Sequence, residues 1–84
     1  MKFTVYFKIN TSSDYAARLI VNHPFLRFYP KSISVRLNYH SDDGKTIDKI
    51  EIFIPDRLVV EVPKFFIGEL RMLSSQIASV RIMA

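Results

Sequence analysis

The side chains that could take part in catalysis or metal binding are few and widely spaced in this sequence. The two histidines, His23 and His40, have no third ligand at the spacing of a metal site, and there is no cysteine. Gly44 and Gly68 are too far apart to form a phosphate-binding loop. Ser74 and Ser75 lie in a predicted helix with no histidine nearby in the sequence that could activate them. The sequence therefore predicts no catalytic residue, no metal and no cofactor, so the chain is not expected to be an enzyme.

Aromatic and basic side chains offer a different chemistry, the binding of RNA. If the strands pair as predicted below, one outward sheet face carries Tyr6, Lys8, Arg36, Asn38, His40, Lys49 and Phe53. Aromatic rings stack on bases and cations contact phosphates, so this mixture is typical of single-stranded RNA binding. Segment 49–53 nevertheless lacks the glycine and paired aromatics of an RNA-recognition-motif strand, and the chain has no GxxG loop of a KH domain. The face is either a solvated sheet surface or an RNA platform with four predicted contacts, Tyr6, Lys8, Arg36 and Lys49.

Length, composition and charge set the broad class of the protein. The chain has 84 residues, of which 49% are hydrophobic and 24% charged, which indicates one globular domain over residues 1–84 and excludes a disordered tail. A chain this short buries only about 60% of its unfolded surface, so we expect an oligomer or a larger assembly. The formal net charge of +4 favours an anionic partner, although the basic residues are scattered.

The sequence also predicts where the protein resides. Without cysteine, no disulfide framework can form. The N-terminal residues alternate between apolar and polar types, and no segment approaches the roughly 18 apolar residues of a transmembrane helix. We therefore expect a cytoplasmic protein with no membrane partner.

Hydrophobic periodicity predicts a strand and a short helix in the first third of the chain. Residues 2–9 alternate strictly, which predicts a half-buried strand with one apolar face formed by Phe3, Val5, Phe7 and Ile9. The polar cluster at 10–14 supplies turn and N-cap residues for a helix through Val21. Pro24 disfavours helical geometry at His23, so residues 24–30 are expected to form an aromatic-rich connection.

Two further alternating runs predict a hairpin. The first run has Ile33, Val35, Leu37 and Tyr39 on one face, and the second has Ile50, Ile52 and Ile54. Between them, Asp43-Gly44 is a dipeptide that tolerates positive φ, as a hairpin turn requires. Ile47 is out of register with the other isoleucines of its run and is interpreted as the mark of a bulge.

The last third of the chain predicts a long helix. Residues 58–62 are either a short extra strand or the lead-in to that helix, and Pro63 suits a first helical turn. The apolar spacing that follows draws one stripe along a helix of about four to five turns, through Phe66, Leu70, Leu73, Ile77 and Val80. The stripe is either core or, in part, a surface for a partner. The predicted fold class is therefore α+β, a three-stranded antiparallel sheet with two helices on one face, in the order strand-helix-strand-strand-helix.

This layout resembles the small dimerisation subunit of the KEOPS complex, which makes threonylcarbamoyladenosine in tRNA. The layout similarity covers nearly the whole chain, and at residue level it is strongest over 68–80, where a Leu70-Arg71 pair precedes apolar residues. The chain departs from the family at 62–67, where the family carries small residues, an arginine and an asparagine. The resemblance therefore points to a diverged member or a paralogue.

The resemblance implies a non-catalytic assembly subunit. Such a chain would form a homodimer or a heterodimer with a related small subunit, would dock on the catalytic subunit of KEOPS and would help to hold tRNA. It implies a docking or tRNA contact at Arg71, and a partner interface at Phe66, Leu70, Leu73 and Ile77. The alternative function is an independent RNA-binding domain that uses its sheet face. A small enzyme with an unrecognised active site is a third possibility, and no group of residues supports it.

Overall fold

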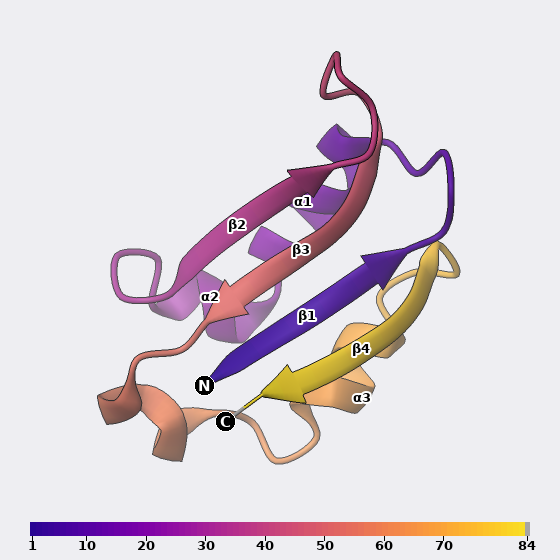
Figure 1. Ribbon diagram of the computed structural model, residues 1–84. Helices are drawn as coiled ribbons and strands as arrows, with labels where there is room; N and C mark the ends of the chain where they lie inside the picture. Colours follow the sequence, from indigo (N-terminus) through magenta and orange to yellow (C-terminus); the bar gives the residue numbers. More distant parts are fainter. Residues whose placement is uncertain (84) are drawn as a thin grey trace.

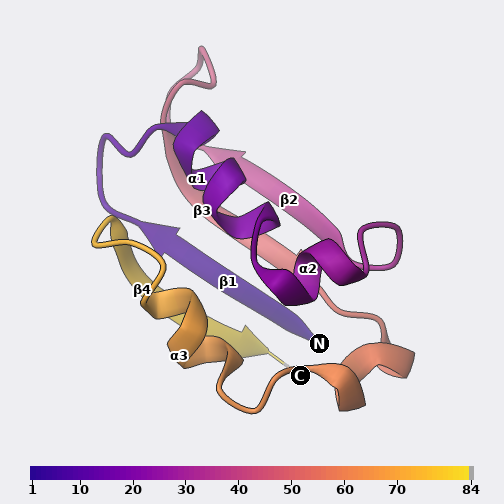
Figure 2. The ribbon, with the colours of Figure 1, turned by 180° about the vertical axis from the view of Figure 1, so that it is seen from behind.

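A four-stranded antiparallel sheet forms the centre of the molecule, in the order β2-β3-β1-β4. The computed structural model describes residues 1–83. The strands are β1 (Lys2–Phe7), β2 (Ser34–Tyr39), β3 (Ile47–Phe53) and β4 (Ile77–Met83). The helical segments are α1 (Ser13–Val21), α2 (Pro24–Phe28), the 3-10 helix η1 (Asp56–Glu61) and α3 (Phe66–Arg71). Figure 1 shows α1, α2 and α3 behind the sheet, and Figure 2 shows the same helices from their own side. Within residues 1–83, no helix is long and apolar enough to cross a bilayer.

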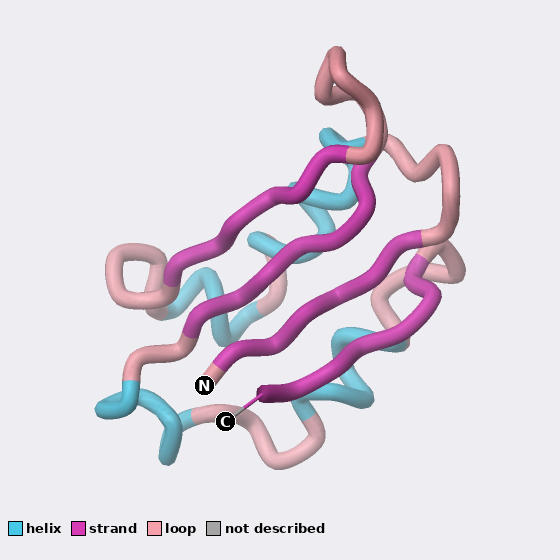
Figure 3. The backbone as a smooth tube through the Cα atoms, viewed as in Figure 1, coloured by secondary structure: helices cyan, strands magenta, loops and turns pink. Residues whose placement is uncertain are grey.

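The α+β class is confirmed, but the prediction of a three-stranded sheet is wrong because β4 adds a fourth strand beside β1. With α1 after β1 and α3 before β4, the chain follows the order β-α-β-β-α-β, with β1 and β3 at the centre of the sheet (Figure 3). This is the ferredoxin-like arrangement. Folds of this kind host many unrelated functions, so the topology positions the site without deciding what it does.

The first strand is shorter than its alternation suggests. Phe3, Val5 and Phe7 are buried as predicted, but Ile9 is 74% exposed and lies beyond the end of β1, so its assignment to the core is wrong. The chain leaves the sheet through a turn in which Asn10 has a φ of 68°, and the Thr11 hydroxyl donates to the Lys8 carbonyl over 2.6 Å. Asparagine is one of the few residues that tolerate this left-handed conformation. Local turn geometry thus ends a strand that hydrophobicity alone would extend.

The helix predicted after this turn is confirmed as α1. The hydroxyl of Ser12 caps it by accepting from the Tyr15 backbone N–H, and Ala16 and Ile20 face the core. Where a connection was predicted, however, Pro24 begins a second short helix, α2. Proline suits the first position of a helix because its missing N–H would have no partner there.

The predicted hairpin is also confirmed. Val35 pairs with Ile52 and Leu37 pairs with Ile50, which places the apolar residues of both strands on one face. Gly44 lies in the connecting turn with a φ of 73°. The pairing shifts between Lys49 and Ile47, so the irregularity expected at Ile47 is present.

The long C-terminal helix is not observed, and that prediction is wrong. Segment 58–62 lies largely in η1 and not in a strand, α3 ends at Arg71, and the chain then turns into β4. The apolar stripe is shared between two elements, because Phe66 and Leu70 belong to α3 while Val80 pairs with Val5 in the sheet. The β-branched residues of the last segment favour a strand, and pairing with β1 supplies the backbone partners that β1 would otherwise lack.

Phe66 joins α3 to the core under the sheet. Its ring makes edge-to-face contacts with the rings of Phe3 and Phe25, at centroid distances of 4.9 Å and 5.4 Å. His23 contacts the same ring at 4.9 Å. The residue that opens α3 thereby links this helix to β1 and to the neighbouring helix α2.

A matched pair of isoleucine substitutions tests the limits of this core. Ile50→Ala should lower the free energy of unfolding by about 2 to 5 kcal/mol, because Ile50 is fully buried between β1 and β2. Ile9→Ala should change it by less than about 0.5 kcal/mol, because that side chain is exposed. Urea unfolding of the two variants measures both values, and an equal destabilisation by the two substitutions would contradict the end of β1 at Phe7.

Candidate nucleic-acid interface

One face of the sheet carries no helix (Figure 1). Its side chains form three rows across the four strands. The strand registers define these rows, and strand alternation places them opposite the core. We call this surface the open face. From one end of the sheet to the other, its rows are Asn38-Lys49-Tyr6-Ser79, Arg36-Glu51-Thr4-Arg81 and Ser34-Phe53-Lys2-Met83.

The ring of Tyr6 has two cations near it. The Lys49 ammonium lies 5.9 Å from the centroid of the Tyr6 ring, and the Arg81 guanidinium lies 5.7 Å from it. These distances are within the range in which a cation is attracted to an aromatic face. The three residues come from β3, β1 and β4, so the sheet itself assembles this group.

A second aromatic residue lies at the other end of the central strand pair. The Lys2 ammonium is 6.0 Å from the centroid of the Phe53 ring, and the two residues are directly paired between β1 and β3. The open face therefore has two ring-and-cation positions, one in its first row and one in its third.

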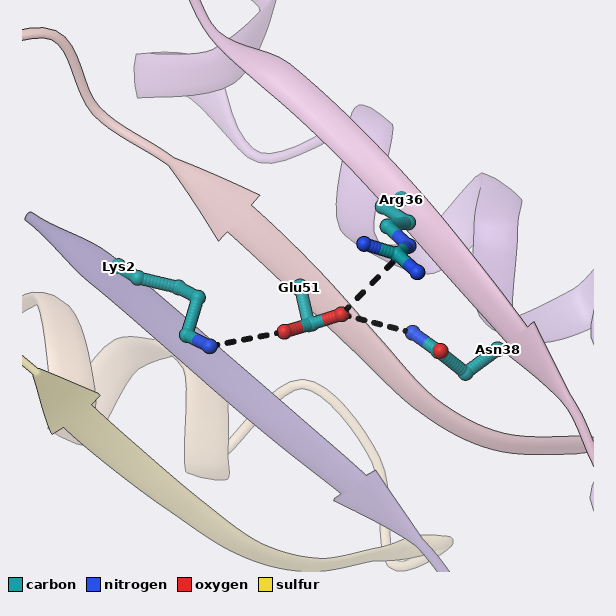
Figure 4. A network of polar contacts seen from close by, with 4 residues as sticks. All are labelled: Lys2, Arg36, Asn38 and Glu51. Atoms are coloured by element: carbon teal, nitrogen blue, oxygen red, sulfur yellow. Dashed lines mark hydrogen bonds and ion pairs between the residues drawn. The ribbon is translucent and has the colours of Figure 1, made fainter.

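Glu51 lies in the middle row and is held by its neighbours (Figure 4). The Lys2 ammonium donates to Oε2 over 2.9 Å, the Asn38 amide donates to Oε1 over 3.0 Å, and the Arg36 guanidinium lies 3.9 Å from Oε1. These contacts leave Glu51 only 7% exposed. The hydrogen bond from Lys2, followed by the one from Asn38, holds the pKa of the Glu51 carboxyl below its ordinary value.

The open face gathers most of the excess positive charge of the chain. Its three rows contain four cations and one carboxylate, which gives +3 out of a formal net charge of +4. The cations of this face are Lys2, Arg36, Lys49 and Arg81. Since basic residues are scattered along the sequence, the fold is what concentrates them.

The structure brings together most of the residues predicted for an RNA face. Tyr6, Arg36 and Lys49 share the open face, whereas Lys8 lies beyond the end of β1 and is exposed there. His40 likewise follows the end of β2.

Sequence reasoning missed Lys2, Glu51 and Arg81. Lys2 lies an even number of residues from Tyr6, and Glu51 lies an even number from Lys49 and Phe53, so strand alternation predicts that they share the open face. The sequence pattern was therefore enough to find Lys2 and Glu51. Arg81 could not have been found, because its segment was assigned to a helix.

The predicted partner interface lies on the other side of the sheet. Phe66 and Leu70 are buried in the core of the chain, and Leu73 and Ile77 are partly buried against it. This placement favours the core interpretation of the stripe. Arg71 is an exposed residue at the end of α3, and α3 lies on the helical side of the sheet (Figure 2).

His23 is held by hydrogen bonds on both nitrogens of its ring. His23 Nδ1 accepts the Phe25 backbone N–H, so Nε2 carries the proton and donates to Glu69 Oε1 over 2.8 Å. Over residues 1–83, no group of three or more His, Cys, Asp or Glu side chains is arranged to hold a metal ion.

Comparisons of the chain with protein-family models, with curated proteins and with solved structures find no match. The assignment to the KEOPS family therefore stays a prediction. The C-terminal helix on which it was strongest is replaced by α3 and β4. The geometry of the open face is thus the basis on which a function can be argued.

The polar contacts of Glu51 predict a pH dependence of stability. The pKa of this carboxyl is lower in the folded chain than its ordinary value of 4.5, so its ionised form stabilises the fold above pH 4.5. That contribution is lost as the pH falls through the lowered pKa. The difference in unfolding free energy between the wild type and Glu51→Gln should therefore shrink as the pH falls below 4.5.

Urea unfolding at a series of pH values measures this difference. Glu61→Gln is the matched control, because Glu61 is an exposed residue of η1, beyond the end of β3. The control measures the effect of removing a carboxylate from outside the network. A difference for Glu51→Gln that changes with pH no more than that of the control would contradict the network in Figure 4.

Proposed function

We propose that the chain binds single-stranded RNA on the open face of its sheet. The observation that carries this proposal is the position of Tyr6, whose ring centroid lies 5.9 Å from the Lys49 ammonium and 5.7 Å from the Arg81 guanidinium. A base stacks on an aromatic ring through its π-face, and neighbouring cations pair with the phosphates on either side of it. The two cations are long and flexible, so they can turn toward phosphates when a base occupies the ring.

The form of the surface favours a single strand over a duplex. Stacking on Tyr6 or Phe53 needs bases with a free face, and the bases of a duplex are already stacked on one another. Ser34 and Ser79 add hydroxyl groups at the two margins of the open face, where they can pair with ribose 2′-hydroxyls. A four-stranded sheet with aromatic side chains that stack on two or three bases is also how the RNA recognition motif binds RNA.

The alternative from the sequence, an assembly subunit of KEOPS, has less support from the described residues. Two of its four interface residues, Phe66 and Leu70, are in the core. The exposed apolar residues of this region are instead Phe65 and Met72, at the two ends of α3. RNA binding on the open face does not require a partner protein to cover Phe65 and Met72.

Replacement of the central ring tests the proposal. Tyr6→Leu keeps an apolar side chain of similar size but removes the stacking surface, so binding to a single-stranded RNA of about ten nucleotides should weaken by about 1 to 3 kcal/mol. Tyr15→Leu is the control, because Tyr15 is an exposed tyrosine of α1 on the helical side. Fluorescence anisotropy measures both affinities, and equal affinities of the two variants would count against the proposed face.

The same titration, repeated over a range of salt concentrations, tests the charges. Arg81→Gln should reduce the slope of log K against log salt by about 0.7 for each phosphate that the arginine neutralises in the wild type. Arg18→Gln removes the same charge from α1, where Arg18 pairs with Asp14 over 3.0 Å, and should leave the slope near the wild-type value. Identical slopes for both variants would mean that net charge, and not the open face, attracts the RNA.

A further inference from the structure

A carboxylate at the centre of a basic, aromatic surface is an unusual component of an RNA-binding face. Glu51 weakens the attraction of phosphates, and yet it lies in the middle row of the open face, between the two aromatic positions. An account based on stacking and charge alone gives it no role. The inference that follows rests on the proposed function and concerns which bases that function selects.

The two rings bracket Glu51 along the strands. Tyr6 is in the first row and Phe53 is in the third, four residues further along the central strand pair. At about 3.3 Å per residue this places the two rows roughly 13 Å apart. An RNA strand that stacks one base on Tyr6 and another on Phe53 must carry the nucleotides between them across the middle row.

The carboxylate presents hydrogen-bond acceptors and no donors. When ionised, it has about four acceptor sites on its two oxygens. Lys2 takes one site on Oε2 and Asn38 takes one on Oε1, so each oxygen keeps capacity for a further donor. The same two contacts hold the group in one orientation, which prepares it to accept from a ligand.

Arg36 is the cation that lies close to Oε1 without a hydrogen bond to it. Its guanidinium is 3.9 Å from Oε1, beyond hydrogen-bond length, and its side chain is 70% exposed. Arg36 can therefore turn outward to a phosphate without breaking a hydrogen bond to Glu51. The movement would uncover Oε1 to the base that crosses the middle row.

We propose that Glu51 selects bases that carry an exocyclic amino group, and that it prefers cytosine to uracil among the pyrimidines. The N4 amino group of cytosine donates a hydrogen bond to a carboxylate, which is an established pairing for acidic side chains. Uracil has a carbonyl oxygen at the corresponding position, and two acceptors repel each other. The two bases have the same ring size, so the comparison keeps the stacked area similar, and a loss of the preference in Glu51→Gln would assign it to this contact.

The test uses fluorescence anisotropy at neutral pH with two RNAs of about ten nucleotides, one of cytidines and one of uridines. The wild-type chain should bind the cytidine RNA between about five- and a hundredfold more tightly. In Glu51→Gln the preference should fall to within about twofold, because the amide both donates and accepts. Glu61→Gln, which removes the same charge from η1, should keep the wild-type preference.

The outcomes distinguish failure of this inference from failure of the proposed function. Equal wild-type affinity for the two RNAs overturns the role of Glu51 and leaves RNA binding intact. Absence of binding to either RNA overturns the proposed function as well. An unchanged preference in a folded Glu51→Gln, with folding checked by circular dichroism, also overturns the inference. The wild-type comparison needs no variant, so equal affinities would overturn the inference even if the substitution prevents folding.

Discussion

The pairing of β1 with β3 on one side and β4 on the other is the constraint on which the rest of the structure depends. The burial of Phe3 and Val5 fixes the register of β1, because a shift of one residue would turn both side chains toward solvent. The same register brings Tyr6 beside Lys49 and next to β4. The core and the candidate site are therefore the two faces of one alternating strand, and neither can change register without the other.

Sequence patterns predicted the parts of the fold that depend on local spacing. The alternation of β1 and of the β2–β3 hairpin, and the turn at Gly44, are each visible within a few residues. The last segment could not be predicted in this way. Its apolar residues fit a helical stripe, and what makes 77–83 a strand is its pairing with β1, at the opposite end of the chain. The local sign of this strand, the alternation of Ser79, Val80, Arg81 and Ile82, covers only four residues, and the longer helical stripe outweighs it.

The same distinction explains how much of the candidate site could be predicted. Alternation placed Tyr6, Arg36 and Lys49 on a common face, and the registers confirm that they share it. The approach of Arg81 to Tyr6 depends on β4, so it was beyond the reach of the pattern. The importance of Glu51 depends on hydrogen bonds from two other strands, β1 and β2, which a linear sequence does not show.

The central claim, that the open face binds single-stranded RNA, is tested most directly by nuclear magnetic resonance of the isotope-labelled wild-type chain. The backbone amide signals would be followed while an RNA of about ten nucleotides is added. The account predicts that the largest shifts arise in β1, β3 and β4, around Tyr6, Lys49 and Arg81. Shifts confined to α1, α2 and α3, or no shifts at RNA concentrations well above those of the protein, would contradict it.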